Sequence, residues 1–176
     1  MTKLLSLFGL VFLAAPVCLA QTPAAQIDRT WLTVDTTAKT ATFQLTAGLT
    51  QLNGGLNFNG FNDGKLTLTV PTNWTVVLRF ANHDANLPHS AEVIDTTKPM
   101  PAGPVEPPAF PRAMTAQARL LQGHGSGETD SVRFVANKAG SYMIFCAVPG
   151  HGLAGMWIRL TVSPTEKRPT LTSSTT

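Results

Sequence analysis

Cysteine is scarce in this chain of 176 residues, which contains only Cys18 and Cys146. Residues 1–20 have the features of a secretory signal peptide, because a positive charge at Lys3 precedes a short apolar run and residues 18–20 fit a small-x-small cleavage site. We expect cleavage after residue 20, which would leave one cysteine and no possibility of an intramolecular disulfide. The apolar run is short for a spanning helix, which needs roughly 20 residues, and an uncleaved membrane anchor is the alternative.

Charged residues are also few, at 13% of the chain. No run of Lys or Arg is dense enough to indicate binding to nucleic acid, so we expect no nucleic-acid partner. The sequence has no P-loop, no dinucleotide-binding fingerprint and no Gly-x-Ser-x-Gly elbow. It also lacks an internal repeat and any sign of a second domain. Removal of 20 of the 176 residues would leave about 156, which is enough for one domain with its own core.

The sequence from residue 30 to residue 163 predicts a single all-β domain. Apolar and polar residues alternate within its short segments, as in strands that cover a core on one side, and Asn-Gly and Asp-Gly turn signals separate several of them. The strand-like segments are residues 40–46, 65–70, 74–80, 90–94, 129–135, 141–147 and 155–162. About eight short strands with no long helix indicate a Greek-key β-sandwich or barrel.

The remaining segments carry weaker signals. Residues 21–29 are polar and predict a loose leader, and residues 164–176 are polar and rich in Pro and Thr, which predicts a disordered tail. The segment 96–111 is rich in proline and cannot form a central strand, so we expect an extended loop. Residues 112–122 could form one short helix.

One loop brings together three side chains with affinity for soft metal ions. Four residues separate Cys146 from His151, and four more separate His151 from Met156. Two histidines and one cysteine with a weak axial methionine form the blue-copper pattern. Taken singly, the three residues could be an inert buried cysteine, a solvent-facing histidine and a core methionine. Their joint spacing in an exported β-protein favours a metal site.

The second histidine of such a site must come from elsewhere in the chain. His89 is the best candidate, because Pro88 fixes the local backbone and Ser90 could form a hydrogen bond near the site. His83, which ends the preceding strand-like segment, is the alternative. His124 lies among glycines, and we expect it to be solvated.

The sequence Phe-Cys-Ala-Val-Pro-Gly-His-Gly-Leu-Ala-Gly-Met-Trp at residues 145–157 resembles the copper loop of cupredoxins, in particular the sulfocyanin and rusticyanin branch with its Cys-x4-His-x4-Met spacing. Residues 56–60, 66–71 and 87–90 are also similar to sulfocyanin, and the similarity extends over residues 30–162. The resemblance implies a Greek-key β-barrel that holds one type 1 copper ion. The implied ligands are His89, Cys146, His151 and Met156.

The same resemblance implies a one-electron carrier and not an enzyme. We expect a monomer in the periplasm or outside the cell that makes transient contacts with a redox donor and a redox acceptor protein. Electrons would pass through the exposed edge of His151, within an apolar docking rim of Pro149, Leu153 and Ala154. Ser90 would help to tune the site.

The sequence alone is also compatible with three other functions. A single-domain copper enzyme would need an open coordination position, which requires that Met156 does not bind. A copper carrier or chaperone would need an exposed cluster of Met and His, and the whole chain has only five methionines. A zinc-binding or purely structural sandwich would have no redox activity.

Overall fold

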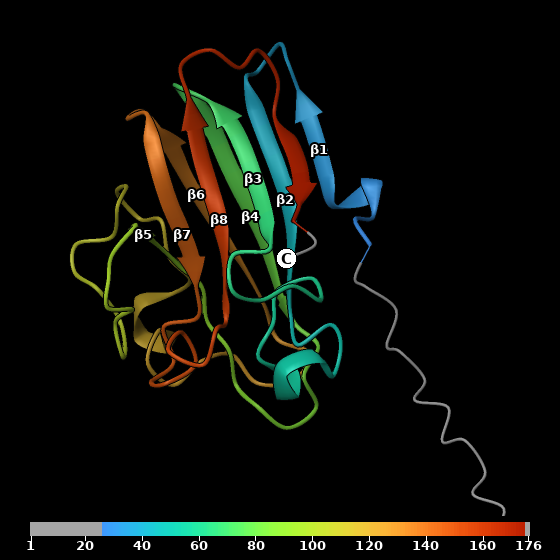
Figure 1. The fold of residues 1–176 in the computed structure, drawn as a ribbon, viewed down its shortest axis with the longest axis vertical. Coiled ribbons are helices and arrows are strands. Elements are labelled where there is room, and N and C mark those ends of the chain that lie inside the picture. The colour runs from blue at the N-terminus through green and yellow to red at the C-terminus, as the bar shows by residue number, and fades with distance from the viewer. Residues whose placement is uncertain (1–25, 175–176) are drawn as a thin grey trace, which may run out of the picture.

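The computed structural model describes residues 26–174, which form two β-sheets packed face to face (Figure 1). The predicted signal peptide, the first part of the predicted leader and the last two residues lie outside the described residues. The described part contains nine strands, so the expected all-β sandwich of about eight strands is confirmed. They are β1 (Leu32–Asp35), β2 (Thr40–Ala47), β3 (Leu66–Pro71), β4 (Trp74–Asn82), β5 (Glu92–Asp95), β6 (Thr129–Ala136), β7 (Gly140–Phe145), β8 (Trp157–Ser163) and β9 (Thr170–Ser173).

Each sheet combines antiparallel pairs with one parallel pair. The first sheet has the order β1-β2-β4-β6, and its β2 and β4 run parallel. The second sheet has the order β5-β7-β8-β3-β9, and its β3 and β8 run parallel. Parallel neighbours need long connections, and these connections carry the chain from one sheet to the other.

The core lies between the sheets and follows the alternation in the sequence. In β2, Phe43 and Leu45 are fully buried while Gln44 between them is exposed. Full burial of an aliphatic or aromatic side chain stabilises the fold by about 1.5–3 kcal/mol. Further fully buried side chains from both sheets are Leu66, Leu68, Val70, Val76, Leu78, Ile144, Ile158 and Leu160.

Helical structure in the described residues is limited to three short 3-10 helices, namely η1 (Arg29–Trp31), η2 (Leu52–Gly55) and η3 (Gln117–Arg119). Each has three or four residues, so none of these helices could cross a membrane. The short helix considered for residues 112–122 is reduced to η3. The preceding backbone is bonded elsewhere, because the N–H of Thr115 donates to the carbonyl of Ala91.

The C-terminal segment differs from the prediction. Residues 164–176 were expected to be disordered, which is wrong for residues 170–173, because these form β9 and pair with the edge of β3. Leu171 lies opposite Leu68 and packs, partly buried, against the core. An edge strand offers free N–H and C=O groups, and pairing with them orders a segment whose own composition is polar.

The loops at one end of the sandwich carry the residues that the sequence analysis identified. β7 runs down to this end and β8 returns from it, so the loop between them lies at the lower end of Figure 1. The connection from β4 to β5, which contains His89, lies at the same end. The segment around η2 is also there, and the side-chain amide of Asn53 donates to the carbonyl of Ala154 at 2.7 Å.

Candidate metal centre

A tight turn in the loop between β7 and β8 returns His151 toward Cys146. The N–H of His151 donates to the carbonyl of Val148 at 3.1 Å across Pro149 and Gly150. Gly150 has φ +84°, and a positive φ at this position with proline before it is typical of a type II turn. Pro149 and Gly150 thus form the turn that directs His151 back toward Cys146.

The turn and the β4–β5 connection bring three potential ligand atoms together. The Sγ atom of Cys146 lies 3.5 Å from Nδ1 of His151 and 3.9 Å from Nδ1 of His89. All three atoms lie within 4.8 Å of one another. The imidazole rings of His89 and His151 are 5.1 Å apart between centroids. Cys146 and His89, which are separated by 57 positions in the sequence, thus converge on one point with His151.

Met156, the third residue of the loop pattern, is tied to both of its partners through the backbone. Its N–H donates to the carbonyl of His151 at 3.0 Å, and its own carbonyl accepts from the N–H of Cys146 at 3.0 Å. The side chain is fully buried and belongs to the same core cluster as Cys146. The loop therefore holds all three residues in a fixed relation.

The other two histidines occupy positions that set them apart from this cluster. His83 is exposed and contributes no atom to it. His124 was expected to be solvated, which is wrong, because only 6% of its surface is accessible. Its backbone exchanges two hydrogen bonds with the backbone of His89, at 3.0 and 2.7 Å, and its Nε2 lies 3.2 Å from Oδ2 of Asp130. Backbone pairing with the segment of His89 explains its burial.

The cysteine sulfur is buried, and a backbone N–H group points toward it. Cys146 is fully buried, and the backbone N–H of Ser90 donates to Sγ at 3.4 Å. The hydroxyl of Ser90 donates to the carbonyl of Leu120 at 2.8 Å. Burial raises the pKa of the Cys146 thiol to about 11, against the smaller lowering effect of the N–H groups of Ser90 and Val148. A positive ion beside the sulfur would reverse this balance, since thiolate ligands are deprotonated.

The two imidazoles are held in the neutral form that a metal requires. Burial and, to a smaller extent, the neighbouring His89 lower the pKa of His151 to about 4, against an opposing effect of Asp84. Burial also lowers the pKa of His89, although Asp84 acts in the opposite direction. Neutral imidazole has one nitrogen with a free lone pair, and in both rings Nδ1 is the nitrogen nearest the sulfur.

Asp84 is a further residue beside the cluster, and the sequence did not predict its position there. Its carboxylate oxygen Oδ2 lies 3.3 Å from Nε2 of His89, on the side of the ring away from the sulfur. The Asp-Ala-Asn sequence at residues 84–86 is typical of a turn in which the aspartate accepts backbone N–H groups. This signal predicts the turn but neither the burial of the carboxylate nor its contact with the histidine.

The donor set fits a soft, redox-active metal. One sulfur, two imidazole nitrogens and a buried thioether nearby match the ligands of blue-copper sites. Zinc in structural sites prefers four thiolate or imidazole ligands, and this cluster offers three such side chains within the described residues. The residues present therefore fit copper better than zinc.

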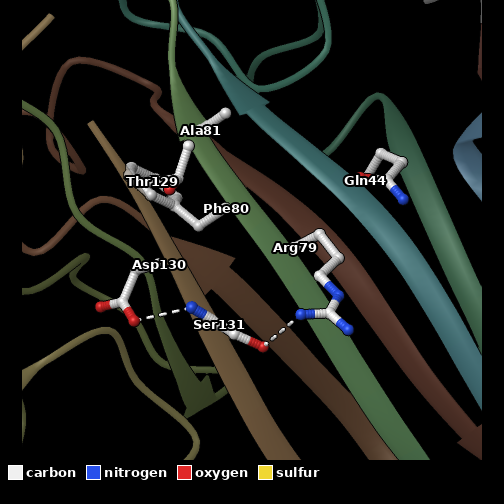
Figure 2. A pocket seen from close by; sticks show the side chains of 7 residues that line it. All are labelled: Gln44, Arg79, Phe80, Ala81, Thr129, Asp130 and Ser131. Atoms are coloured by element: carbon white, nitrogen blue, oxygen red, sulfur yellow. Dashed lines mark hydrogen bonds between the residues drawn. The ribbon is translucent and has the colours of Figure 1, made fainter. Parts of the chain in front are cut away.

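A surface hollow lies outside this cluster, on the first sheet. Figure 2 shows a groove along β4 and β6 in which Arg79 donates to the hydroxyl of Ser131 at 3.4 Å. None of His89, Cys146 and His151 lines it. The groove is not part of the cluster.

Comparisons with known proteins agree with this geometry. The model of the sulfocyanin (SoxE) domain family matches residues 28–172. Sulfocyanin of Sulfolobus acidocaldarius is 30% identical over 112 residues, which cover 61% of this chain and 55% of that protein. The chain thus spans about half the length of this curated relative.

Solved structures of blue copper proteins share the fold. A rusticyanin structure matches with a TM-score of 0.55 and 22% identity, covering 71% of this chain and 78% of the other. Auracyanin B, known from Chloroflexus aurantiacus, matches with a TM-score of 0.50 and 27% identity, covering 70% of this chain and 88% of the other. Cupredoxins of this kind bind one type 1 copper ion and generally act as electron carriers. The sequence, the fold and the family match together place this chain in the sulfocyanin family of blue copper cupredoxins.

Proposed function

We propose that this protein is an exported one-electron carrier in which His89, Cys146, His151 and Met156 bind one copper ion. The convergence of the ligand atoms of His89, Cys146 and His151 within 4.8 Å carries this proposal. The buried position of Met156, whose backbone is hydrogen-bonded to both Cys146 and His151, supports its assignment as the fourth ligand.

When bound, copper supplies the one-electron chemistry by cycling between Cu(I) and Cu(II). The chain contributes a frame that holds the ligands in place in both states. Backbone hydrogen bonds from Cys146 to Met156 and from Met156 to His151 close the loop on itself. The N–H of Ser90 faces the sulfur from the neighbouring connection. A frame of this kind limits the rearrangement that accompanies gain or loss of an electron.

The surface around His151 is suited to brief contact with another protein. His151 is partly exposed, and Pro149, Leu153 and Ala154 of the same loop are exposed. Leu153 keeps 55% of its surface accessible. Redox encounters use interfaces at the small end of the range, so we propose that a donor and an acceptor protein dock here in turn, each with a monomer of this chain.

Export would place this carrier in the periplasm or outside the cell. The predicted signal peptide at residues 1–20, which lies outside the described residues, supports this location. In an oxidising compartment a free thiol is open to oxidation. Burial and metal binding would protect Cys146 there.

The test is the visible and electron paramagnetic resonance spectrum of the protein after loading with Cu(II). We expect intense colour from charge transfer between the thiolate and copper, with bleaching by ascorbate and recovery on reoxidation. A colourless Cu(II) form would contradict the proposal. An intense band together with turnover of a small substrate would support the alternative of a copper enzyme.

A further inference from the structure

Behind the cluster, one buried carboxylate contacts the imidazole of His89. Asp84 is 5% exposed, and its Oδ2 lies 3.3 Å from Nε2 of His89, whose side chain is fully buried. The other ring nitrogen of His89 faces the sulfur of Cys146 at 3.9 Å. The ring therefore has a carboxylate on one side and the thiol on the other.

The carboxylate of Asp84 is held in place by backbone N–H donors. Its Oδ1 accepts the backbone N–H groups of Asn86 at 2.8 Å and of Leu87 at 3.0 Å. Its own N–H donates to the side-chain oxygen of Asn82 at 2.8 Å. With Oδ1 occupied by two donors, Oδ2 is the atom left for His89. A carboxylate that meets only donors favours a proton on the facing nitrogen.

Two glycines leave room for Asp84, because a side chain at either position would collide with it. A Cβ atom at Gly55 would lie 2.1 Å from Oδ2 of Asp84, and one at Gly48 would lie 2.6 Å from the Asp84 Cβ. Both glycines have positive φ, +89° and +62°. The segment around η2 is therefore shaped around Asp84, and the position of the carboxylate is determined from two sides.

Building on the copper site proposed above, we propose that Asp84 is a positioning residue that keeps the proton of His89 on Nε2, so that Nδ1 presents its lone pair beside the Cys146 sulfur. Outer partners of this kind orient ligating histidines and raise their basicity. The negative charge of Asp84 also stabilises the more positive, oxidised form of the site, which lowers the reduction potential.

The first measurement uses the wild-type protein without metal and requires no variant. Nitrogen-15 NMR of the imidazole rings distinguishes a proton on Nε2 from one on Nδ1. We expect His89 to carry it on Nε2. A proton on Nδ1 would overturn the proposal, whatever the variants do.

The second measurement uses the variant Asp84→Asn. The oxygen of the new amide stays with the two backbone donors and its NH2 group faces the ring, so that Nε2 of His89 must accept and the proton moves to Nδ1. We expect this change of tautomer in the NMR spectrum, a loss of copper affinity of about 10- to 100-fold, and a higher reduction potential. An unchanged tautomer with unchanged affinity would overturn the proposal.

Asp63→Asn is the matched control. Asp63 is an exposed residue whose N–H donates to the carbonyl of Gly155, so it lies beside the loop between β7 and β8. Removal of its charge should leave the tautomer of His89 unchanged and shift the potential less than Asp84→Asn does, because solvent screens exposed charges. Equal shifts of the reduction potential in both variants would mean that Asp84 acts only through its charge, and would overturn its role as a positioning residue.

The blue band of the wild-type protein distinguishes failure of this proposal from failure of the proposed copper function. If the band is absent while His89 has the expected tautomer, the copper function fails, and Asp84 still positions the ring of His89.

Discussion

Leu153 and Val135 expose similar fractions of apolar surface at opposite ends of the sandwich. The exposed fractions are 55% for Leu153 and 49% for Val135. Val135 lies near the end of β6, shortly before β7 begins at Gly140, whereas Leu153 follows the other end of β7. A strand of about six residues spans about 20 Å, so Leu153 belongs to the end with His151 and Val135 does not.

This relationship allows a test of the docking surface that needs no known partner. We expect Leu153→Asn to slow electron self-exchange between oxidised and reduced copies of the protein by about 10-fold, which corresponds to ~1.4 kcal/mol, because the encounter must bury the loop around His151. NMR line broadening in mixtures of the two oxidation states measures the rate. Val135→Asn is the control and should leave the rate within about 2-fold. Equal slowing in both variants would contradict the assigned surface.

Cys146→Ser tests the sulfur directly. The intense visible band should disappear, because the hydroxyl of serine provides no thiolate for charge transfer. The side chain is fully buried and changes little in size, so we expect the metal-free variant to remain within about 1–2 kcal/mol of wild type in unfolding free energy. Absorption of the copper-loaded variant and urea denaturation of the metal-free variant measure the two effects. Retention of the band by a folded variant would refute Cys146 as a ligand.

His83 and His89 form a matched pair for the histidine assignment. His83 is exposed, whereas His89 is fully buried beside the sulfur. His83→Ala should keep the blue band and change the unfolding free energy by no more than about 0.5 kcal/mol. His89→Ala should abolish the band. If His83→Ala bleached the protein instead, the two assignments would have to be exchanged.

Much of the fold could be predicted because its information is local. The alternation of buried and exposed residues along β2, with Phe43 and Leu45 inward and Gln44 outward, is a property of the strand itself. The spacing of Cys146, His151 and Met156 is likewise local, since one turn at residues 149–150 determines how the loop returns.

The features that could not be predicted depend on contacts between distant segments. β9 is polar and gains its order from pairing with β3, about 100 residues earlier. His124 is buried because its backbone pairs with that of His89, although the surrounding glycines indicate a solvated loop. From the sequence alone, a charged residue such as Asp84 is predicted to lie at the surface. Its packing against Gly48 and Gly55 and its contact with His89 become visible only in the structure.

The pairing of β9 predicts a modest contribution of the C-terminal segment to stability. Leu171 is partly buried against the core, whereas Thr172 next to it is exposed. We expect Leu171→Ala to lower the unfolding free energy by about 1–2 kcal/mol, below the range for fully buried leucines. Thr172→Ala should stay within about 0.5 kcal/mol. Urea denaturation of both variants measures the difference, and equal stability would mean that β9 does not contribute through its apolar contact.

Glu92 should make the stability of the protein depend on pH. This residue of β5 is fully buried, and its carboxyl oxygens accept the N–H of Val105 at 3.2 and 3.3 Å. Burial raises the pKa of Glu92 from 4.5 to about 7; the N–H of Val105 opposes this shift, and the nearby Glu106 adds to it. Because the folded state holds the proton more tightly than the unfolded state, the associated stability is fully present below pH 4.5 and is lost as the pH rises through about 7.

We therefore expect the unfolding free energy of the wild-type protein to fall between about pH 5 and pH 8 by on the order of 2 kcal/mol relative to Glu92→Gln, since one pKa unit corresponds to about 1.4 kcal/mol. The amide of glutamine remains neutral over this range, so the variant lacks the proton that wild type must release. Urea denaturation of the copper-loaded proteins at several pH values gives the difference. Glu166→Gln, at an exposed position between β8 and β9, is the control and should follow the wild-type profile. Parallel profiles for wild type and Glu92→Gln would show that Glu92 keeps the same protonation state in the folded and unfolded chain.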